Sequence, residues 1–269
     1  MGLRIQNNVE AFNAHRQLNS TAAKAAKAME KLSSGYRINR AADDAAGLAI
    51  SEKMRGQIGG LAQAQRNAQD GVSLVQTAEG AMEDVHSMLQ RVRELKVQYD
   101  GGTLSTSDKA AIDSEFTQLK SEITAVRDNT EFNGTKLLNA AGTTTFQVGA
   151  NSGETISVTR VDLVGASGTS GVTSAADLSA VSIAAVDTAI DNVSKIRGDF
   201  GAVQNRLEHR LNNLSTYQEN LVASESRIRD VDMASEMVNF SKMQILQQAG
   251  TSMLAQANQS SQSVLSLLR

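Results

Sequence analysis

The chain lacks three residue types that mark other classes of protein. Its 269 residues include no Pro, no Cys and no Trp, and aromatic residues make up only 3%. Without Pro, long uninterrupted helices are permitted. Without Cys there is no disulfide framework and no thiolate metal site. The core must therefore consist largely of Ala, Leu, Val, Ile and Met, a composition that suits long helices better than a compact α/β body.

Strong charge of one sign and long apolar runs are also missing. The net charge is −3, which argues against a nucleic-acid partner. No stretch approaches 18 consecutive apolar residues, so no transmembrane helix is expected. The locally basic segment 4–40 is interpreted as a solvated or inter-subunit helix face rather than as a membrane contact. The N-terminal segment has no continuous apolar run, so we expect no cleavable signal peptide.

Charge is scarce at both ends of the chain. Residues 235–269 contain only three charged side chains, and residues 1–23 contain another three. In both segments, apolar or small side chains recur at spacings of three and four, as on one face of a helix. Ordering about 70 residues costs on the order of 1–2 kcal/mol of backbone entropy for each one. Two lone helices do not offset that cost, so the stripes are expected to meet each other or other copies of the chain.

The predicted polymerisation core consists of twelve members of these two stripes. Those of the N-terminal segment are Ile5, Val9, Phe12, Leu18, Met29 and Leu32. Those of the C-terminal segment are Met243, Leu246, Met253, Ala257, Val264 and Leu267. Segments with so little apolar bulk can stay disordered alone and bury their stripes once neighbours are present.

A strict heptad seam predicts one helix over about 45–99, far longer than most globular helices. The members of the seam are Leu61, Ala64, Ala68, Gly71, Val75, Ala78, Met82, Val85, Leu89 and Val92. A matching seam runs from Val193 to Val231. A shorter helix is expected over about 107–128, with Ser107–Asp108 as its N-cap region. Together they predict a mainly α fold, a long antiparallel helical bundle of coiled-coil type.

A small β element is expected between the two seams. Alternating apolar residues flank a four-residue turn at 150–153, and they are Phe146, Val148, Ile156 and Val158. This pattern predicts a β-hairpin at the distal end of the bundle. The Gly/Ser/Thr-rich stretch 165–177 is expected to be a surface loop or a small cap.

Two domains are expected. Residues 1–43 and 231–269 would form a discontinuous inner coiled coil. Residues 44–230 would form an outer helical bundle that carries the hairpin and the loop at about 143–177.

No set of residues points to catalysis, a metal or a cofactor. The three histidines are isolated, and none belongs to a ligand pair at helical spacing. Asp43 and Asp44 are interpreted as an N-cap or as ion-pair partners of Arg37 or Arg40. The acidic run at 230–232 lacks the remaining ligands of a calcium loop. There is also no phosphate loop and no G-x-S-x-G elbow.

Long motifs of the chain resemble bacterial flagellin over nearly its whole length, apart from roughly residues 160–190. Three motifs are similar to the N-terminal signature of that family, namely NVEAFNAHRQLN, MEKLSSGYRINRAADDAAGLAISEKMRGQIGGL and NAQDGVSLVQTAEGAM. TEFNGTKLLN and FQVGANSGETI resemble the segments that follow. Similar to the C-terminal signature is ILQQAGTSMLAQANQSSQSVLSLLR.

This resemblance implies a structural subunit that polymerises into the flagellar filament for swimming motility. It implies export in the unfolded state through the flagellar type III apparatus, an extracellular location, and assembly at the filament tip through coiled coils of the terminal helices. It implies the filament cap, junction proteins, an export chaperone and the export gate as partners, beside other copies of the chain. The short interval between the two conserved halves indicates a form with little or no outer variable domain.

The resemblance also covers a segment that the vertebrate Toll-like receptor for flagellin recognises, with the pattern Q-R-V-R-E-L-x-V. It matches residues 90–97, except that Lys96 stands where a small residue is common. The implied contacts, which would also lie between filament strands, are Gln90, Arg91, Glu94, Leu95 and Glu115. The alternative is that these residues serve only packing between strands.

Three other functions are compatible with parts of the sequence pattern. A hook–filament junction protein shares the architecture, and a secreted coiled-coil protein could bind a host partner as a monomer. An enzyme within 140–190 would need a motif such as the HExxH of metalloproteases, and none occurs.

Overall fold

The computed structural model describes residues 8–165 and 169–267, and it confirms the mainly α fold. The helices are α1 (Val9–Ser34), α2 (Ala45–Tyr99), α3 (Thr106–Asn129), α4 (Ser170–Thr173), α5 (Ile183–Arg229), α6 (Met233–Leu267) and the short 3-10 turn η1 (Leu178–Ala180). The strands are β1 (Glu131–Phe132), β2 (Thr135–Lys136), β3 (Gly142–Gln147) and β4 (Thr155–Arg160).

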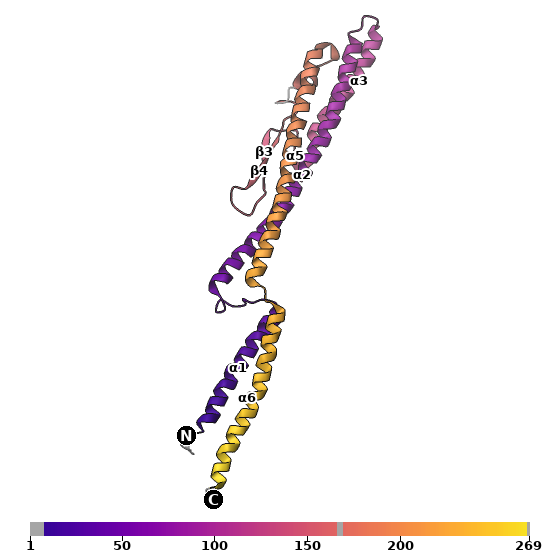
Figure 1. Ribbon diagram of the computed structural model, residues 1–269. Coiled ribbons are helices and arrows are strands. Elements are labelled where there is room, and N and C mark those ends of the chain that lie inside the picture. The colour runs from indigo at the N-terminus through magenta and orange to yellow at the C-terminus, as the bar shows by residue number, and fades with distance from the viewer. Residues whose placement is uncertain (1–7, 166–168, 268–269) are drawn as a thin grey trace. The chain divides into compact units, whose positions relative to one another are not determined.

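These elements form two compact units (Figure 1). The terminal unit consists of Met1–Gly56 together with Asn220–Arg269, and the middle unit of Gln57–Glu219. The terminal unit therefore takes in the first turns of α2 and the last turns of α5.

The predicted long helix is confirmed, since α2 begins at Ala45 and ends at Tyr99. Every member of its heptad seam, from Leu61 to Val92, is buried. Asp44 caps the start of the helix, because the backbone N–H of Gly47 donates to its Oδ1 at 2.9 Å. Burial of one continuous stripe explains why 55 residues without Pro remain a single helix.

Helices α3 and α5 complete the core of the middle unit. The late seam is buried at four positions, namely Val193, Phe200, Leu207 and Leu214. Tyr217, the next member, is exposed. The seam therefore serves core packing mainly in its first half.

Helix α3 begins slightly before the predicted residue, with Ser105 rather than Ser107 as its N-cap. The backbone N–H of Asp108 donates to Ser105 Oγ at 3.2 Å, and the N–H of Ser105 donates to the Asp108 carboxylate at 3.0 Å. These reciprocal bonds form a capping box. Hydrogen bonds from Ser105, the side-chain bond first, lower the pKa of Asp108.

The predicted hairpin is confirmed as the antiparallel pair β3–β4, in which Phe146 lies opposite Ile156. Its turn is longer than expected. The N–H of Val148 donates to the carbonyl of Glu154 at 2.8 Å, which leaves 149–153 as the loop.

The sequence led us to expect the hairpin at the distal end of the bundle, but it does not lie there. It packs beside the early part of α2 and the middle of α5 (Figure 1). A Cβ on Gly60 of α2 would come within 3.2 Å of the Ala150 side chain, so any larger residue at this position would push the hairpin turn back by a few tenths of an ångström. On the other side, Arg210 Nε donates to the carbonyl of Val148 at 2.9 Å. The arginine that interrupts the α5 seam therefore anchors the hairpin.

The Gly/Ser/Thr-rich stretch is anchored to the bundle rather than free, in its described part from 169 onward. Val172 in α4 is fully buried. Lys120 Nζ of α3 donates to the carbonyl of Ala175 at 2.8 Å, and the N–H of Leu178 donates to Asp113 Oδ1 at 3.0 Å. A segment of small polar residues is thus held by helix α3.

The short hairpin β1–β2 was not predicted. Its turn consists of Asn133 and Gly134, which both have positive φ, 49° and 76°. Asn-Gly is a common sequence in such turns, so this dipeptide could have predicted the hairpin from the sequence.

We expect Phe116→Ala to lower the free energy of unfolding by about 3–5 kcal/mol, since this side chain is fully buried at the centre of the core. Phe12→Ala is the matched control, because the Phe12 side chain is 69% exposed. Its effect on the monomer should stay within about 0.5 kcal/mol. Urea unfolding followed by circular dichroism measures both. Equal losses for the two variants would contradict this description of the core.

Candidate functional site: the terminal helices

The terminal unit is built around an antiparallel pair of helices, α1 and α6 (Figure 1). At one end of the pair, Asn8 Nδ2 donates to the carbonyl of Ala257 at 2.9 Å. At the other end, the N–H of Val231 donates to the carbonyl of Gly35 at 3.0 Å. Between these points the two helices lie side by side along their length (Figure 1).

Small side chains allow this close approach. The residues of α1 that are buried are Thr21, Ala25 and Ala28. On α6, a Cβ on Gly250 would lie 3.2 Å from the Leu18 side chain, so Leu18 packs directly over the glycine. Small residues therefore line the closest approach of the two helices, with Leu18 as the bulky side chain that covers the glycine.

The structure buries only some residues of the predicted polymerisation core. Four of its residues are partly buried along the helix pair, and they are Leu18, Leu32, Met243 and Ala257. Five are exposed on the same two helices, and they are Val9, Phe12, Met29, Leu246 and Met253. Ile5 lies outside the described residues, as do the side chains of Val264 and Leu267.

An open apolar groove of about 470 Å³ runs along the exposed side of α6. Its lining includes Met237, Val238, Ile245 and Leu246, with Lys242 among them. The apolar residues Met237, Val238 and Ile245 were missed by the sequence analysis, which followed a single stripe. The signal was present, because Val238 and Ile245 are seven residues apart and recur on one helix face.

A second groove lies between the two helices. It is lined by Ala22, Ala25 and Met29 of α1 and by Phe240 and Gln247 of α6, among others. The terminal unit thus keeps apolar surface open after its own helices have paired, which a monomeric protein rarely does over a large area.

Backbone hydrogen bonds join the two chain segments beyond the helix pair. Tyr36 and Asp230 form an antiparallel β-bridge, and the N–H of Arg37 donates to the carbonyl of Arg229 at 2.6 Å. The Arg229 guanidinium lies 4.8 Å from the centroid of the Tyr36 ring and 2.6 Å from the Glu52 carboxylate. This bridge fixes where α1 ends relative to the start of α6.

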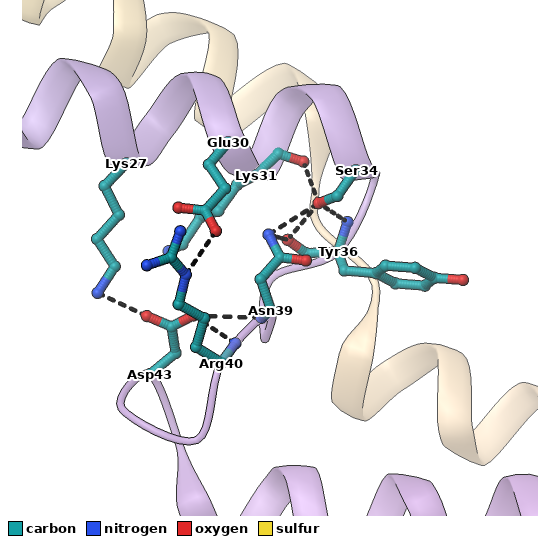
Figure 2. A network of polar contacts seen from close by, with 8 residues as sticks. All are labelled: Lys27, Glu30, Lys31, Ser34, Tyr36, Asn39, Arg40 and Asp43. Atoms are coloured by element: carbon teal, nitrogen blue, oxygen red, sulfur yellow. Dashed lines mark hydrogen bonds and ion pairs between the residues drawn. The ribbon is translucent and has the colours of Figure 1, made fainter.

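The segment after α1 folds back onto that helix through a polar network (Figure 2). Lys27 Nζ lies 2.6 Å from Asp43 Oδ1, and Arg40 Nε lies 2.9 Å from Glu30 Oε1. The other Asp43 oxygen accepts the backbone N–H groups of Asn39 and Arg40 at 3.2 and 3.1 Å. The hydrogen bond from Lys27, followed by those from the backbone, lowers the pKa of Asp43 to about 2.

This network corrects one prediction and confirms another. Asp43 pairs with Lys27, not with Arg37 or Arg40, because the chain reversal brings it against the last turns of α1. The N-cap role holds for Asp44, as described above.

The segment 90–97 presents most, but not all, of the residues implied for receptor contact. Arg91 Nε lies 2.8 Å from Glu115, and its Nη1 lies 3.0 Å from Glu94. These bonds, led by that with Glu115, raise the pKa of Arg91. Gln90 is also exposed.

Leu95, the other implied contact residue, does not lie on the surface. Its side chain is 1% exposed and belongs to the core of the middle unit. Lys96, where the motif departs, is also buried and directs its ammonium to Asp100 at 2.8 Å. Leu95 therefore belongs to the core and not to the surface that carries Gln90, Arg91, Glu94 and Glu115.

Among the residues that the structure describes, no group of three His, Cys, Asp or Glu could hold a metal ion. Asp232, in the acidic run considered above, caps α6, accepting the N–H groups of Ala234 and Ser235 at 3.0 and 3.2 Å. None of the described helices is long and apolar enough to cross a membrane.

Comparison with known proteins covers nearly the whole chain. A model of the bacterial flagellin N-terminal helical region matches residues 5–143, and a model of the bacterial flagellin C-terminal helical region matches residues 183–268. The flagellin of Halalkalibacterium halodurans is 54% identical over 273 residues, which cover 98% of this chain and 99% of the relative. That of Bacillus subtilis is 50% identical over 306 residues, covering 99% of this chain and 100% of the relative. A crystal structure of Bacillus cereus flagellin matches with a TM-score of 0.51 and 34% identity, covering 60% of this chain and 94% of that one.

The polar network predicts an acid-resistant carboxylate. We expect Asp43 to be still ionised at pH 3, because its pKa is lowered from 3.8 to about 2. The stabilisation that the charged form gives the folded segment is complete above about pH 4 and is lost as the pH falls through about 2. An NMR titration of the Asp43 side chain measures this directly.

Lys27→Met should raise the pKa of Asp43 toward 3.8, since it removes the largest cause of the shift. Lys24→Met is the matched control on the same helix, because Lys24 is also an exposed lysine of α1 and is not among the groups that shift the pKa of Asp43. A wild-type pKa near 3.8, or equal shifts in the two variants, would contradict the network.

Proposed function

Because this chain belongs to the bacterial flagellin family and is a structural subunit of the flagellar filament rather than an enzyme, we propose that it polymerises through the apolar faces that α1 and α6 leave exposed. The family matches support neither the hook–filament junction alternative nor the secreted monomer.

One observation carries this proposal. Five predicted core residues stay exposed although α1 and α6 have already paired, and Phe12 and Met253 expose 69% and 65% of their surface. Covering such side chains releases roughly 25 cal/mol per Å² of apolar surface. Neighbouring subunits would supply that cover, and repeated heterologous contacts of this kind extend into an open filament rather than a closed ring.

The arrangement of domains follows from the same surface. In this proposal, residues 1–43 and 231–269 form the inner coiled coil of the filament. The bundle within 44–230 surrounds it and carries the hairpin β3–β4 outward. The scarcity of charge near both termini supports this order, because the most deeply buried layer tolerates the fewest unpaired charges.

Export and location complete the proposal. The subunit would leave the cell unfolded through the flagellar type III apparatus and function outside it, without a cleavable signal peptide. Its partners would be the export chaperone, the export gate, the junction proteins and the cap. Terminal segments that bury little apolar surface on their own support the unfolded passage.

We also propose recognition by the innate immune receptor for flagellin. The exposed ion-pair cluster of Arg91, Glu94 and Glu115, with Gln90 beside it, supports this. Arg91 joins the two helices, since it contacts Glu94 on α2 and Glu115 on α3. A receptor surface with complementary charges would contact both helices at once.

Polymerisation is tested with Phe12→Gln and Met253→Gln, each expected to raise the critical concentration for assembly about ten- to a hundredfold. Burying an amide without a partner costs roughly 1–3 kcal/mol, which gives that range. Sedimentation and electron microscopy of seeded assembly measure the effect. Met253→Leu keeps the size and apolar character of the side chain and should assemble normally. Normal assembly of both Gln variants would refute the proposed surface.

Receptor recognition is tested with Arg91→Ala in a cell line that reports receptor activation. We expect at least a tenfold weaker response, from the loss of charge-assisted hydrogen bonds worth roughly 1.5–3 kcal/mol. Arg93→Ala is the matched control, because Arg93 pairs instead with Asp187 of α5 at 2.6 Å. Equal losses in the two variants would argue for a general effect on the bundle and against a specific contact.

A further inference from the structure

The sulfur atoms of this protein are unevenly placed. With no Cys in the sequence, all of them belong to its nine methionines. Four methionines are about half exposed or more, and their exposed fractions are 65% for Met253, 55% for Met29, 50% for Met237 and 48% for Met233. All four lie on α1 or α6 of the terminal unit. Met82, in the seam of the middle unit, is fully buried.

We propose that Met29, Met233, Met237 and Met253 form an oxidation site through which peroxides block assembly of the free subunit. The proposal rests on the proposed function, because it requires the exposed faces of α1 and α6 to be buried on polymerisation.

The reaction is an oxygen transfer to a thioether by a hydroperoxide. A sulfur lone pair attacks the distal peroxide oxygen, a new S–O bond forms and the O–O bond breaks. The sulfur loses two electrons, and the peroxide is reduced to water or an alcohol after proton transfer. Access to the sulfur controls the rate, so exposed methionines react before buried ones.

The sulfoxide places a strong dipole where the surface is apolar. Met237 lines the groove on α6, and Met29 lines the groove between α1 and α6. Burying each new S=O group without a hydrogen-bond donor is unfavourable. Val238, Ile245 and Leu246, which line the same groove as Met237, offer no side-chain donor; Ser241 and Lys242, its polar members, are exposed and would have to give up contact with water to pair with the new dipole. Oxidised subunits would therefore fold as before but fail to add to a filament.

Methionine differs from leucine at these positions in two ways. Its flexible thioether adapts to an irregular neighbouring surface. Its oxidation is also reversible, because sulfoxide reductases restore the thioether. A subunit oxidised before assembly could thus be repaired, whereas subunits in the filament would be protected by burial.

The test treats purified monomer with hydrogen peroxide and locates sulfoxides by peptide mass spectrometry. We expect Met253 to react first and Met82 last, with Met29, Met237 and Met233 between them. The critical concentration for seeded assembly should rise about tenfold or more in the treated protein. Incubation with methionine sulfoxide reductases should restore it. In preformed filaments, the same four residues should resist oxidation.

A variant with all four methionines replaced by leucine serves as the matched control, since this exchange nearly conserves volume. It should assemble normally and remain competent after peroxide treatment. Treated wild type that carries the four sulfoxides and still assembles would overturn the proposal. So would equal loss of assembly in the treated leucine variant.

If the untreated leucine variant does not fold, the reductase experiment on wild type decides alone. Assembly that is not restored after the sulfoxides are removed would refute the proposal. Failure of the underlying surface is distinguished by Phe12→Gln and Met253→Gln, which test that surface without any oxidant.

Discussion

The close pairing of α1 with α6 through small side chains is the constraint on which the terminal unit depends. Ala25 and Ala28 are buried in the interface, and Leu18 packs over Gly250. A thin interface buries little apolar area and so contributes little stability. Other bulky side chains on the same helices, such as Phe12 and Met253, stay exposed. The small side chains at the interface therefore account both for the low stability expected of the α1–α6 pair and for the apolar surface that it leaves exposed.

In the middle unit, by contrast, the apolar core is buried within one chain. Its seam on α2 changes from small residues such as Ala64 and Ala68 to bulky ones such as Leu89, and all of them are buried. The core therefore closes within one chain, and ion pairs such as Arg93–Asp187 lie on its surface. One sequence thus combines a self-sufficient bundle with ends that need neighbours.

Much of this organisation could be read from the sequence, because heptad spacing reports burial directly. The bounds of α2, the buried seam and the hairpin β3–β4 followed from periodicity alone. Periodicity does not tell which partner covers a stripe, so Phe12 and Leu18 were grouped together although only Leu18 faces α6.

Contacts between distant segments were beyond such reasoning. The pairing of Asp43 with Lys27 depends on a chain reversal whose geometry no local pattern specifies. The place of the hairpin beside α2 likewise depends on Gly60 and Arg210, which belong to two different helices. Leu95 was assigned to a surface by its motif, yet it lies in the core.

The β-bridge between Tyr36 and Asp230 has a consequence for the order of folding. Joining segments this far apart in an unstructured chain carries a large loop-closure entropy, whereas neighbouring helices such as α2 and α3 meet across a short turn. Once residues 57–219 have folded, the effective loop is much shorter, and the entropy lost when the bridge forms is smaller. The ends of the chain are therefore the last to become ordered, which keeps them available until a filament end is there to receive them.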